Sequence, residues 1–133
     1  MSISLDIEIE SKVDINDILS VLHEMKFEYI FKNEDEIRGN FPISNIFAVF
    51  HRVSNLNEMK PRTEGADFAR DWKIGVRANF YYVMSRYNEC SADMHEFLIK
   101  LNNKSDAYFI FSFEREKVYA VNDNKGMRFF NEF

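Results

Sequence analysis

A chain of 133 residues, 46% of them hydrophobic and 16% aromatic, is long enough to bury one core and too apolar to remain disordered. Its 4 Gly and 2 Pro argue against collagen-like architectures and against glycine-loop phosphate sites. A net charge of −5 disfavours nucleic acid as a partner, because binding to phosphates needs a local excess of Lys and Arg. We expect one domain over residues 1–133.

The sequence also bears on the cellular compartment. The single cysteine, Cys90, cannot form a disulfide within the chain, whereas secreted domains of this size more often carry an even number of cysteines. The first residues lack the basic and apolar regions of a secretion signal, and no stretch approaches about 18 uninterrupted apolar residues. These features predict a cytoplasmic protein without a membrane segment.

The chain begins with a predicted strand and a predicted helix. Apolar and polar residues alternate over residues 2–10, which predicts a strand with one buried and one hydrated face. Asp6, Glu8 and Glu10 belong to the hydrated face, as expected for a strand near the edge of a sheet. Asp14 is the expected cap of a helix over residues 15–26, where apolar residues recur at helical spacing.

The middle of the chain predicts four strands and one long connection. Residues 27–31 and 37–41 flank a polar turn and predict a β-hairpin, and residues 46–53 predict a central strand. Residues 54–71 follow neither period, which predicts either a short helix near residues 65–70 or a functional loop. A long strand is expected over residues 72–84, with Gly75 marking a bulge or bend.

The last third predicts a second helix and a meander of three strands, with the aromatic residues of this region in the core. Ser91 is a possible cap of the helix. Its expected buried stripe consists of Met94, Phe97, Leu98 and Leu101. Together these elements predict an α+β fold, with a mostly antiparallel sheet and about two helices packed on one face.

No motif of catalysis or metal binding stands out. The three histidines lack the spacing of metal ligands, and Cys90 is not placed to act with His95 as a nucleophile. The carboxylates Glu8 and Glu10, and those of residues 34–36, are expected to be hydrated, without the apolar surroundings that raise a carboxyl pKa for acid catalysis. The sequence therefore predicts no catalytic residue, no metal and no cofactor.

The charge is distributed unevenly along the chain. Residues 1–45 carry ten acidic and four basic side chains, a net charge of −6, whereas the remaining residues carry +1. An acidic surface of this kind attracts a basic partner, although many proteins carry such a surface without any partner. The candidate acidic face comprises Asp17, Glu24, Glu28, Glu34, Asp35 and Glu36.

The long connection provides a second candidate surface. It contains Arg62 and Arg70 and leads directly into Trp72, the only tryptophan. Protein interfaces are enriched in Arg and Trp, and loops on a rigid scaffold often carry function. The alternative is that Trp72 is an ordinary core residue at the start of a strand.

Three segments of the chain resemble a known class of proteins. They are IRGNFPISNIFAVF at residues 37–50, WKIGVRANFYYV at residues 72–83, and the ending from residue 106. They are similar to immunity proteins of bacterial contact-dependent growth inhibition and related polymorphic toxin systems. The resemblance implies that the chain binds a cognate toxin domain and occludes its active site or its partner surface.

A different reading remains open at this point. A small-molecule or peptide-binding α+β module, or a weakly marked enzyme, would use the cavity between the sheet and the helices. The position of the gene beside a secreted toxin gene would favour the immunity hypothesis, and a place in a metabolic operon would favour the alternative. The sequence leaves the oligomeric state open.

Overall fold

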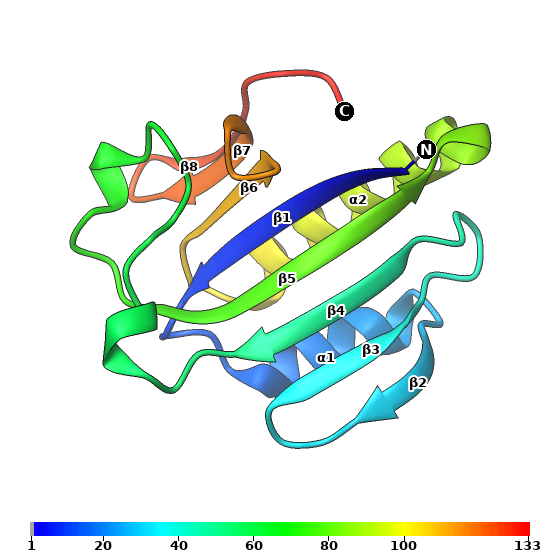
Figure 1. Cartoon of the computed structure of the whole chain (residues 1–133), viewed down its shortest axis with the longest axis horizontal. Helices are drawn as coiled ribbons and strands as arrows, with labels where there is room; N and C mark the ends of the chain where they lie inside the picture. Colours follow the sequence, from blue (N-terminus) through cyan, green and yellow to red (C-terminus); the bar gives the residue numbers. More distant parts are fainter. Residues whose placement is uncertain (1) are drawn as a thin grey trace.

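A computed structural model describes residues 2–133 as one eight-stranded sheet with two helices. The strands are β1 (Ser2–Glu10), β2 (Glu28–Lys32), β3 (Glu36–Asn40), β4 (Phe47–Arg52), β5 (Ile74–Val83), β6 (Phe109–Phe113), β7 (Lys117–Asp123) and β8 (Gly126–Phe129). The helices are α1 (Ile15–Glu24) and α2 (Tyr87–Lys104). Both helices lie behind the same face of the sheet (Figure 1), so the predicted α+β class is confirmed.

The strand order is β2-β3-β4-β5-β1-β6-β7-β8, and every neighbouring pair is antiparallel. Since β5 and β6 both pair with β1, they run parallel to each other on either side of it, joined by α2. The four central strands and two helices therefore follow the split β-α-β arrangement of ferredoxin-like folds. The β2–β3 hairpin widens the sheet at one edge, and β7–β8 widen it at the other.

The central position of β1 corrects the expectation of an edge-like strand. β1 pairs with β5 over its whole length and with β6 over residues 5–9. Its polar side chains therefore have neighbours on both sides: Asp6 is 6% exposed, Glu8 1% and Glu10 7%. The alternation of side chains is as predicted, but the carboxylates are buried.

Helix α1 forms for the reasons visible in its sequence. Asp14 Oδ1 accepts a hydrogen bond from the Asn16 backbone N–H at 2.9 Å, which caps the helix as predicted, and Asp17 lies in the first turn. Ile18 and Leu22 are fully buried against the sheet. The helix ends two residues earlier than expected, at Glu24, before Lys26 with φ of +58°.

Helix α2 begins at Tyr87, so the expectation of a cap at Ser91 was wrong. Its first turn is held in place by Cys90, which is fully buried with its Sγ 3.7 Å from the carbonyl oxygens of Ser44 and Val83. This tertiary contact makes the segment before Ser91 helical. Ser91 itself, inside the helix, donates its hydroxyl to the Phe133 carbonyl.

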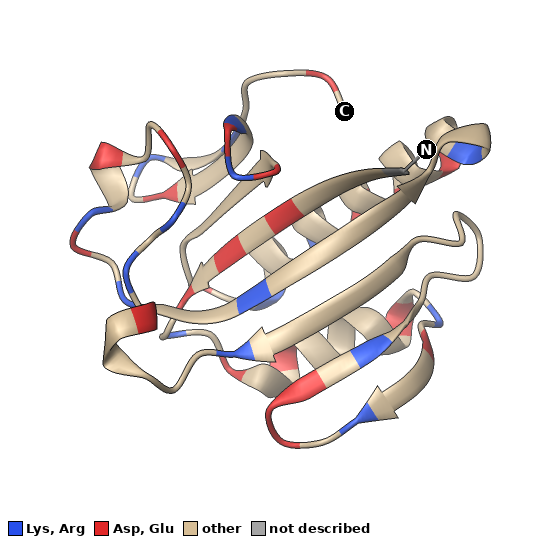
Figure 2. Cartoon of the chain, viewed as in Figure 1, with Lys and Arg blue, Asp and Glu red and all other residues tan. Residues whose placement is uncertain are grey.

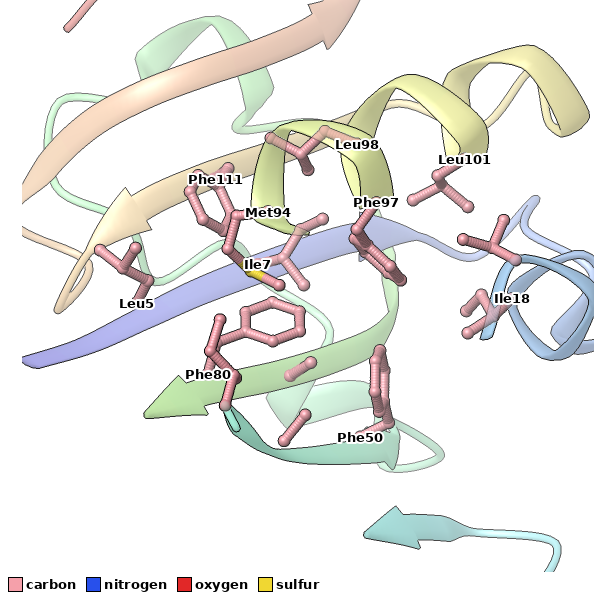
Figure 3. Packing of buried hydrophobic residues seen from close by; sticks show 14 of the residues in the cluster. Leu5, Ile7, Ile18, Phe50, Phe80, Met94, Phe97, Leu98, Leu101 and Phe111 are labelled. Carbon is pink, nitrogen blue, oxygen red and sulfur yellow. The ribbon is translucent and has the colours of Figure 1, made fainter. Parts of the chain in front are cut away.

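The main core lies between the sheet and the helices. Figure 3 shows Ile7 of β1, Phe80 of β5 and Phe97 of α2 converging, and all three are fully buried. The predicted stripe of α2, from Met94 to Leu101, is buried in the same cluster. The strand face that carries Leu5, Ile7 and Ile9 is thus sealed by helices.

The aromatic residues of the last third fill this core only in part. Phe109, Phe111 and Phe133 are buried, and the Phe133 ring stacks on His95 at 4.1 Å between centroids. In contrast, Phe129 is 42% and Phe130 53% exposed, so the expectation that they lie in the core was wrong. The reason is that β8 is an edge strand with no further strand beside it, so the stacking of Phe129 on His95 of α2 at 5.2 Å covers its ring only in part.

Gly75 produces the predicted bulge. Ile9 pairs with Val76 and Glu10 with Ile74, which leaves Gly75 as the extra residue of β5. A Cβ atom at Gly75 would lie 2.6 Å from the Cα of Ser11, closer than two carbon atoms approach. The bulge brings the start of β5 close to the end of β1.

No helix in the described part of the chain is both long and apolar enough to cross a membrane.

Candidate functional site

The face of the sheet opposite the helices carries the polar side chains of the central strands. The register aligns them in three rows across the strands. The first row is Glu28, Asn40, Phe47, Tyr81 and Ser4; the second is Phe31, Arg38, Val49, Asn79, Asp6 and Ser112; the third is Glu36, His51, Arg77, Glu8, Ile110 and Val121. Figure 2 shows the acidic bands of β1 beside the basic band of β5 on this open face.

Glu8 and Arg77 form a buried ion pair in the third row. Arg77 Nε donates a hydrogen bond to Glu8 Oε2 at 2.9 Å, and Arg77 Nη2 lies 2.9 Å from the same oxygen as an ion-pair contact. Its two Nη atoms also donate to the carbonyl oxygens of Glu58 and Lys60. Burial lowers the pKa of the Arg77 guanidinium, and the charge of Glu8 opposes this effect.

The Glu8 carboxylate also holds the long connection, residues 54–71, against the sheet. It accepts hydrogen bonds from the backbone N–H groups of Arg62 and Thr63 at 2.9–3.0 Å, and from the Thr63 hydroxyl. Every oxygen of the carboxylate and every guanidinium nitrogen of its partner therefore has a hydrogen-bond partner. Such a saturated pair acts mainly as a structural anchor for the loop.

The loop that this pair fastens has a small core of its own. It contains two 3-10 turns, Leu56–Glu58 and Asp67–Ala69, the second of which confirms the short helix expected near residues 65–70. Ala66 and Ala69 pack on Ile110 and Val121 of the open face, and Trp72 packs partly buried against this second cluster. The loop therefore covers the β6–β7 side of the face and the part of β1 and β5 that carries Glu8 and Arg77, and it leaves the Phe47–Tyr81 end of the face uncovered.

Asp6 and Asn79 form the neighbouring pair in the second row, and this pair is not saturated. Asn79 donates its amide N–H to Asp6 Oδ1. Among the described residues, nothing donates to Asp6 Oδ2 and nothing pairs with Asn79 Oδ1. Burial raises the pKa of the Asp6 carboxyl, partly offset by the Asn79 hydrogen bond and the charge of Arg115.

A pocket of about 400 Å³ opens above this pair. Asp6 and Asn79 lie in its wall together with the anchoring pair Glu8–Arg77. Its remaining charged lining comes from three segments far apart in sequence, namely Arg52 and His51 from β4, Glu58 and Arg62 from the loop, and Arg115 from the β6–β7 turn. The volume is within the range of small-molecule sites.

An aromatic patch lies at the other end of the open face. Phe47 and Tyr81 stack at 6.1 Å between ring centroids, and Tyr81 is 39% exposed. Ile43, 64% exposed, belongs to the adjacent β3–β4 turn, where its carbonyl oxygen accepts a hydrogen bond from Arg86. In Figure 1 this turn lies beside the end of β5, after which Met84 is also exposed. We call Ile43, Phe47, Tyr81 and Met84 the aromatic patch.

The residues expected to form an acidic face lie on three elements, α1, β2 and the β2–β3 turn with the start of β3, and two of them pair with basic side chains. Glu24 binds Lys100 at 3.2 Å and also Lys104, so two lysines of α2 neutralise its charge and lower its carboxyl pKa. Glu36 lies on the open face and pairs with Arg38 at 2.7 Å. The remaining acidic residues of the set are Asp17 in α1, Glu28 in β2, and Glu34 and Asp35 in the β2–β3 turn.

The second predicted surface, formed by Arg62, Arg70 and Trp72, is divided as well. Arg62 lines the pocket, whereas Arg70 is exposed at the end of the second 3-10 turn. Trp72 is neither a fully buried core residue nor an exposed anchor, because its ring packs 5.2 Å from Tyr108 and 5.8 Å from Phe68. The structure therefore places these three side chains in three different surroundings.

Four central residues of the site, Asp6, Glu8, Arg77 and Asn79, were missed in the sequence. A signal did exist: two acidic residues alternate at positions 6 and 8, and a basic and an amide residue alternate at positions 77 and 79. Antiparallel pairing of the two segments places Asp6 opposite Asn79 and Glu8 opposite Arg77. No pattern in the sequence predicted that Arg115 would lie beside these four residues.

Other chemistry is sparse in the described residues. No group of three or more His, Cys, Asp or Glu side chains there is arranged to hold a metal ion. Burial raises the pKa of the Cys90 thiol, which favours an unreactive protonated sulfur. In comparisons with known proteins, no family model matches the chain and no curated protein matches its sequence.

Proposed function

We propose that the protein is a stoichiometric binding protein of the immunity type, which neutralises a cognate bacterial toxin domain by covering it, and that the partner docks on the aromatic patch. The observation that carries this proposal is the uncovered end of the open face. One face of the sheet is sealed by two helices, and the loop of residues 54–71 covers part of the other. The stacked pair of Phe47 and Tyr81 lies on the part that remains open.

The composition of the patch is that of a protein interface. Aromatic residues, Met and Arg are enriched at such surfaces, and here the exposed Met84 follows β5, and Arg86 donates a hydrogen bond to the Ile43 carbonyl of the patch. Tyr gives a large contact area at a low cost in conformational entropy, so Tyr81 is the expected energetic centre. Its phenol also provides a hydrogen-bonding group at the rim.

The partner proposed for this surface is a basic protein domain. The chain has a net charge of −5, and the exposed acid Glu28 ends the same row that contains Phe47 and Tyr81. Acidic groups around an apolar centre accelerate association with a basic partner and fix its orientation. Complementary charge at the rim and apolar contact at the centre together suit a tight inhibitory complex.

The test uses the toxin domain encoded beside the gene of this protein. We expect the two purified proteins to form a one-to-one complex by light scattering, and toxin activity to fall in proportion to the molar ratio until it is abolished at one equivalent. Full protection at a small fraction of one equivalent over many turnovers would overturn a stoichiometric mechanism, as would the absence of any complex.

A pair of tyrosine variants tests the docking surface. Tyr81→Ala should weaken the complex by about 2 kcal/mol, or about thirtyfold in Kd, as expected for a central aromatic residue. Tyr29→Ala is the matched control, because Tyr29 is 41% exposed on the edge strand β2 and packs edge-on against Phe27. Equal effects of the two substitutions would remove the aromatic patch as the docking surface.

A further inference from the structure

The pocket above Asp6 and Asn79 has no part in the proposed docking, yet it combines three features of a ligand site. It is a cavity of about 400 Å³, its wall contains a buried carboxyl group with an open hydrogen-bonding position, and its rim carries cationic side chains without partners. Each feature rests on different residues and is argued separately below.

The rim of the pocket carries three arginines that form no ion pair within the described residues. The other guanidinium groups of the open face are occupied: Arg77 pairs with Glu8, and Arg38 with Glu36. The guanidinium groups of Arg52, Arg62 and Arg115 make no hydrogen bond and no ion pair within the part of the chain that the structure describes. Three planar cations around one cavity form a favourable site for an anionic group, which a guanidinium binds through two parallel hydrogen bonds.

The floor of the pocket presents acceptors. Asp6 is 6% exposed, and its Oδ1 already receives the Asn79 amide N–H. This hydrogen bond orients the Asn79 side chain, so that Asn79 Oδ1 and Asp6 Oδ2 remain available for hydrogen-bond donors. Both residues line the pocket, so a ligand that supplies hydroxyl groups can donate hydrogen bonds to these two atoms.

The anchoring of the loop does not explain Asp6. Glu8, two residues along β1, makes the hydrogen bonds to the loop and to Arg77. Among the described residues, Asp6 contacts neither the loop backbone nor an arginine at hydrogen-bond distance, and its one side-chain partner there is the uncharged amide of Asn79. The fold therefore does not require a carboxylate at this position in the way it requires Glu8.

We propose that this pocket binds a small organic anion that carries hydroxyl groups, with Arg62 and Arg115 holding the anionic group and Asp6 and Asn79 accepting hydrogen bonds from the hydroxyls. Arg52 and His51 close the side formed by β4. Phosphate and carboxylate groups share the chemistry that guanidinium recognises. Hydroxylated phosphate esters and hydroxy acids are therefore the two candidate sources of the anion.

The experiment measures binding of four probes to the full chain by calorimetry and by amide chemical shifts at near-physiological salt. The probes are ribose 5-phosphate, tartrate, inorganic phosphate and ribose. At least one of the two hydroxylated anions should bind about tenfold more tightly than both phosphate and ribose, because it alone engages the rim and the floor together. The shifts should centre on Asp6, Asn79 and Arg115.

Three variants assign the binding to this pocket. Arg115→Gln and Asp6→Asn should each reduce the affinity for the best probe by about tenfold. Arg70→Gln is the matched control, since Arg70 is an exposed arginine of the loop that carries Arg62 and lies outside the pocket lining. It should leave the affinity unchanged.

Each result supports or overturns the proposal. Tighter binding of ribose 5-phosphate supports a phosphate ester, and tighter binding of tartrate supports a hydroxy acid. Equal binding of inorganic phosphate and the hydroxylated anions would overturn the role of Asp6 and Asn79. Equal losses in Arg115→Gln and Arg70→Gln would show a general charge effect and overturn the site, as would no measurable binding of any anion.

Discussion

Two polar pairs lie side by side on β1 and β5, and the comparison between them separates a structural anchor from a candidate site. Glu8–Arg77 and Asp6–Asn79 are consecutive in register and share the open face. Glu8 and Arg77 have partners at every polar atom, most of them on the loop of residues 54–71. Asp6 has one partner, and a cavity lies beside it.

The difference shows that burial alone does not distinguish a structural carboxylate from one that could bind a ligand. Both carboxylates are more than nine-tenths buried. For Glu8, hydrogen bonds from the protein itself compensate the free-energy cost of burying the carboxylate. For Asp6, the one hydrogen bond from Asn79 compensates this cost only in part. Incomplete satisfaction of a buried group beside a cavity is the feature that points to a ligand, and four predictions test whether the two pairs differ as described.

The largest expected effect follows from Glu8→Ala. The substitution leaves the buried Arg77 guanidinium without its counter-ion and three loop donors without an acceptor, so the free energy of unfolding should fall by about 3–5 kcal/mol. Urea denaturation measures it, and faster proteolysis within residues 54–71 should accompany it. Glu8→Gln keeps the shape if the alanine variant fails to fold. Glu64→Ala, an exposed acid in the same loop, is the control, and an equal loss there would contradict the anchoring role.

The loop also depends on its small apolar cluster. Trp72→Ala should lower the free energy of unfolding by about 2–3 kcal/mol, less than a fully buried tryptophan, because Trp72 is only partly buried against Phe68 and Tyr108. Affinity for the protein partner, corrected for the folded fraction, should not change. A loss of affinity without a loss of stability would instead restore Trp72 as an interface anchor.

Thr63→Val tests a single hydrogen bond of the saturated pair. The Thr63 hydroxyl donates to Glu8 Oε1 in a buried environment, and its removal should cost about 1–2 kcal/mol of the free energy of unfolding. Thr63→Ser keeps the hydroxyl and should recover most of this loss. If valine and serine are equally stable at this position, the hydroxyl does not contribute to fastening the loop.

Asp6→Asn should raise the free energy of unfolding at neutral pH, whereas Glu8→Ala should lower it. Burial raises the pKa of Asp6 above 3.8, its usual value, against the opposing charge of Arg115 and with the added repulsion of Glu8 and Glu114. As pH rises above 3.8 the unfolded chain loses this proton first, so the wild-type protein loses stability up to the folded-state pKa. The asparagine variant lacks this loss.

The stability of Asp6→Asn relative to the wild type should therefore rise as the pH increases from 3.8 to the folded-state pKa of Asp6. At higher pH the difference should stay constant. Urea midpoints measured from pH 3.5 to pH 8 follow the change, with Asn79→Ala as a control for loss of the hydrogen bond alone. A variant that is less stable than the wild type at neutral pH would show that the Asp6 carboxylate is structural, and the contrast between the two pairs would be lost.

Local patterns in the sequence predicted most elements. Alternation over residues 2–10 identified β1, Asp14 identified the start of α1, and Gly75 identified the bulge in β5. These features depend on contacts within a few residues, where side-chain period and backbone preference act directly. The start of α2 was missed because Cys90 holds its first turn through contacts with residues 44 and 83.

The order of the strands was decided only by tertiary structure. Alternation shows that a strand has two faces, but it does not show whether another strand lies on each side, and β1 is equally consistent with an edge or a centre. Its central place buries Glu8 and Asp6 and thereby produces both the anchor and the pocket. The sequence also did not show that Glu24 of the expected acidic face pairs with Lys100 and Lys104, because these contacts arise from the packing of α1 beside α2.

The sequence by itself thus determined the class of the fold, the positions of its helices and strands, and which side chains share a strand face. Tertiary structure decided which of those side chains meet: Arg77 with Glu8, Asn79 with Asp6, and Arg115 with Arg62 at the pocket rim. The physical reason is distance along the chain. Period and propensity act over a few residues, whereas the charges of this site come from five segments that only the assembled sheet and its fastened loop bring together.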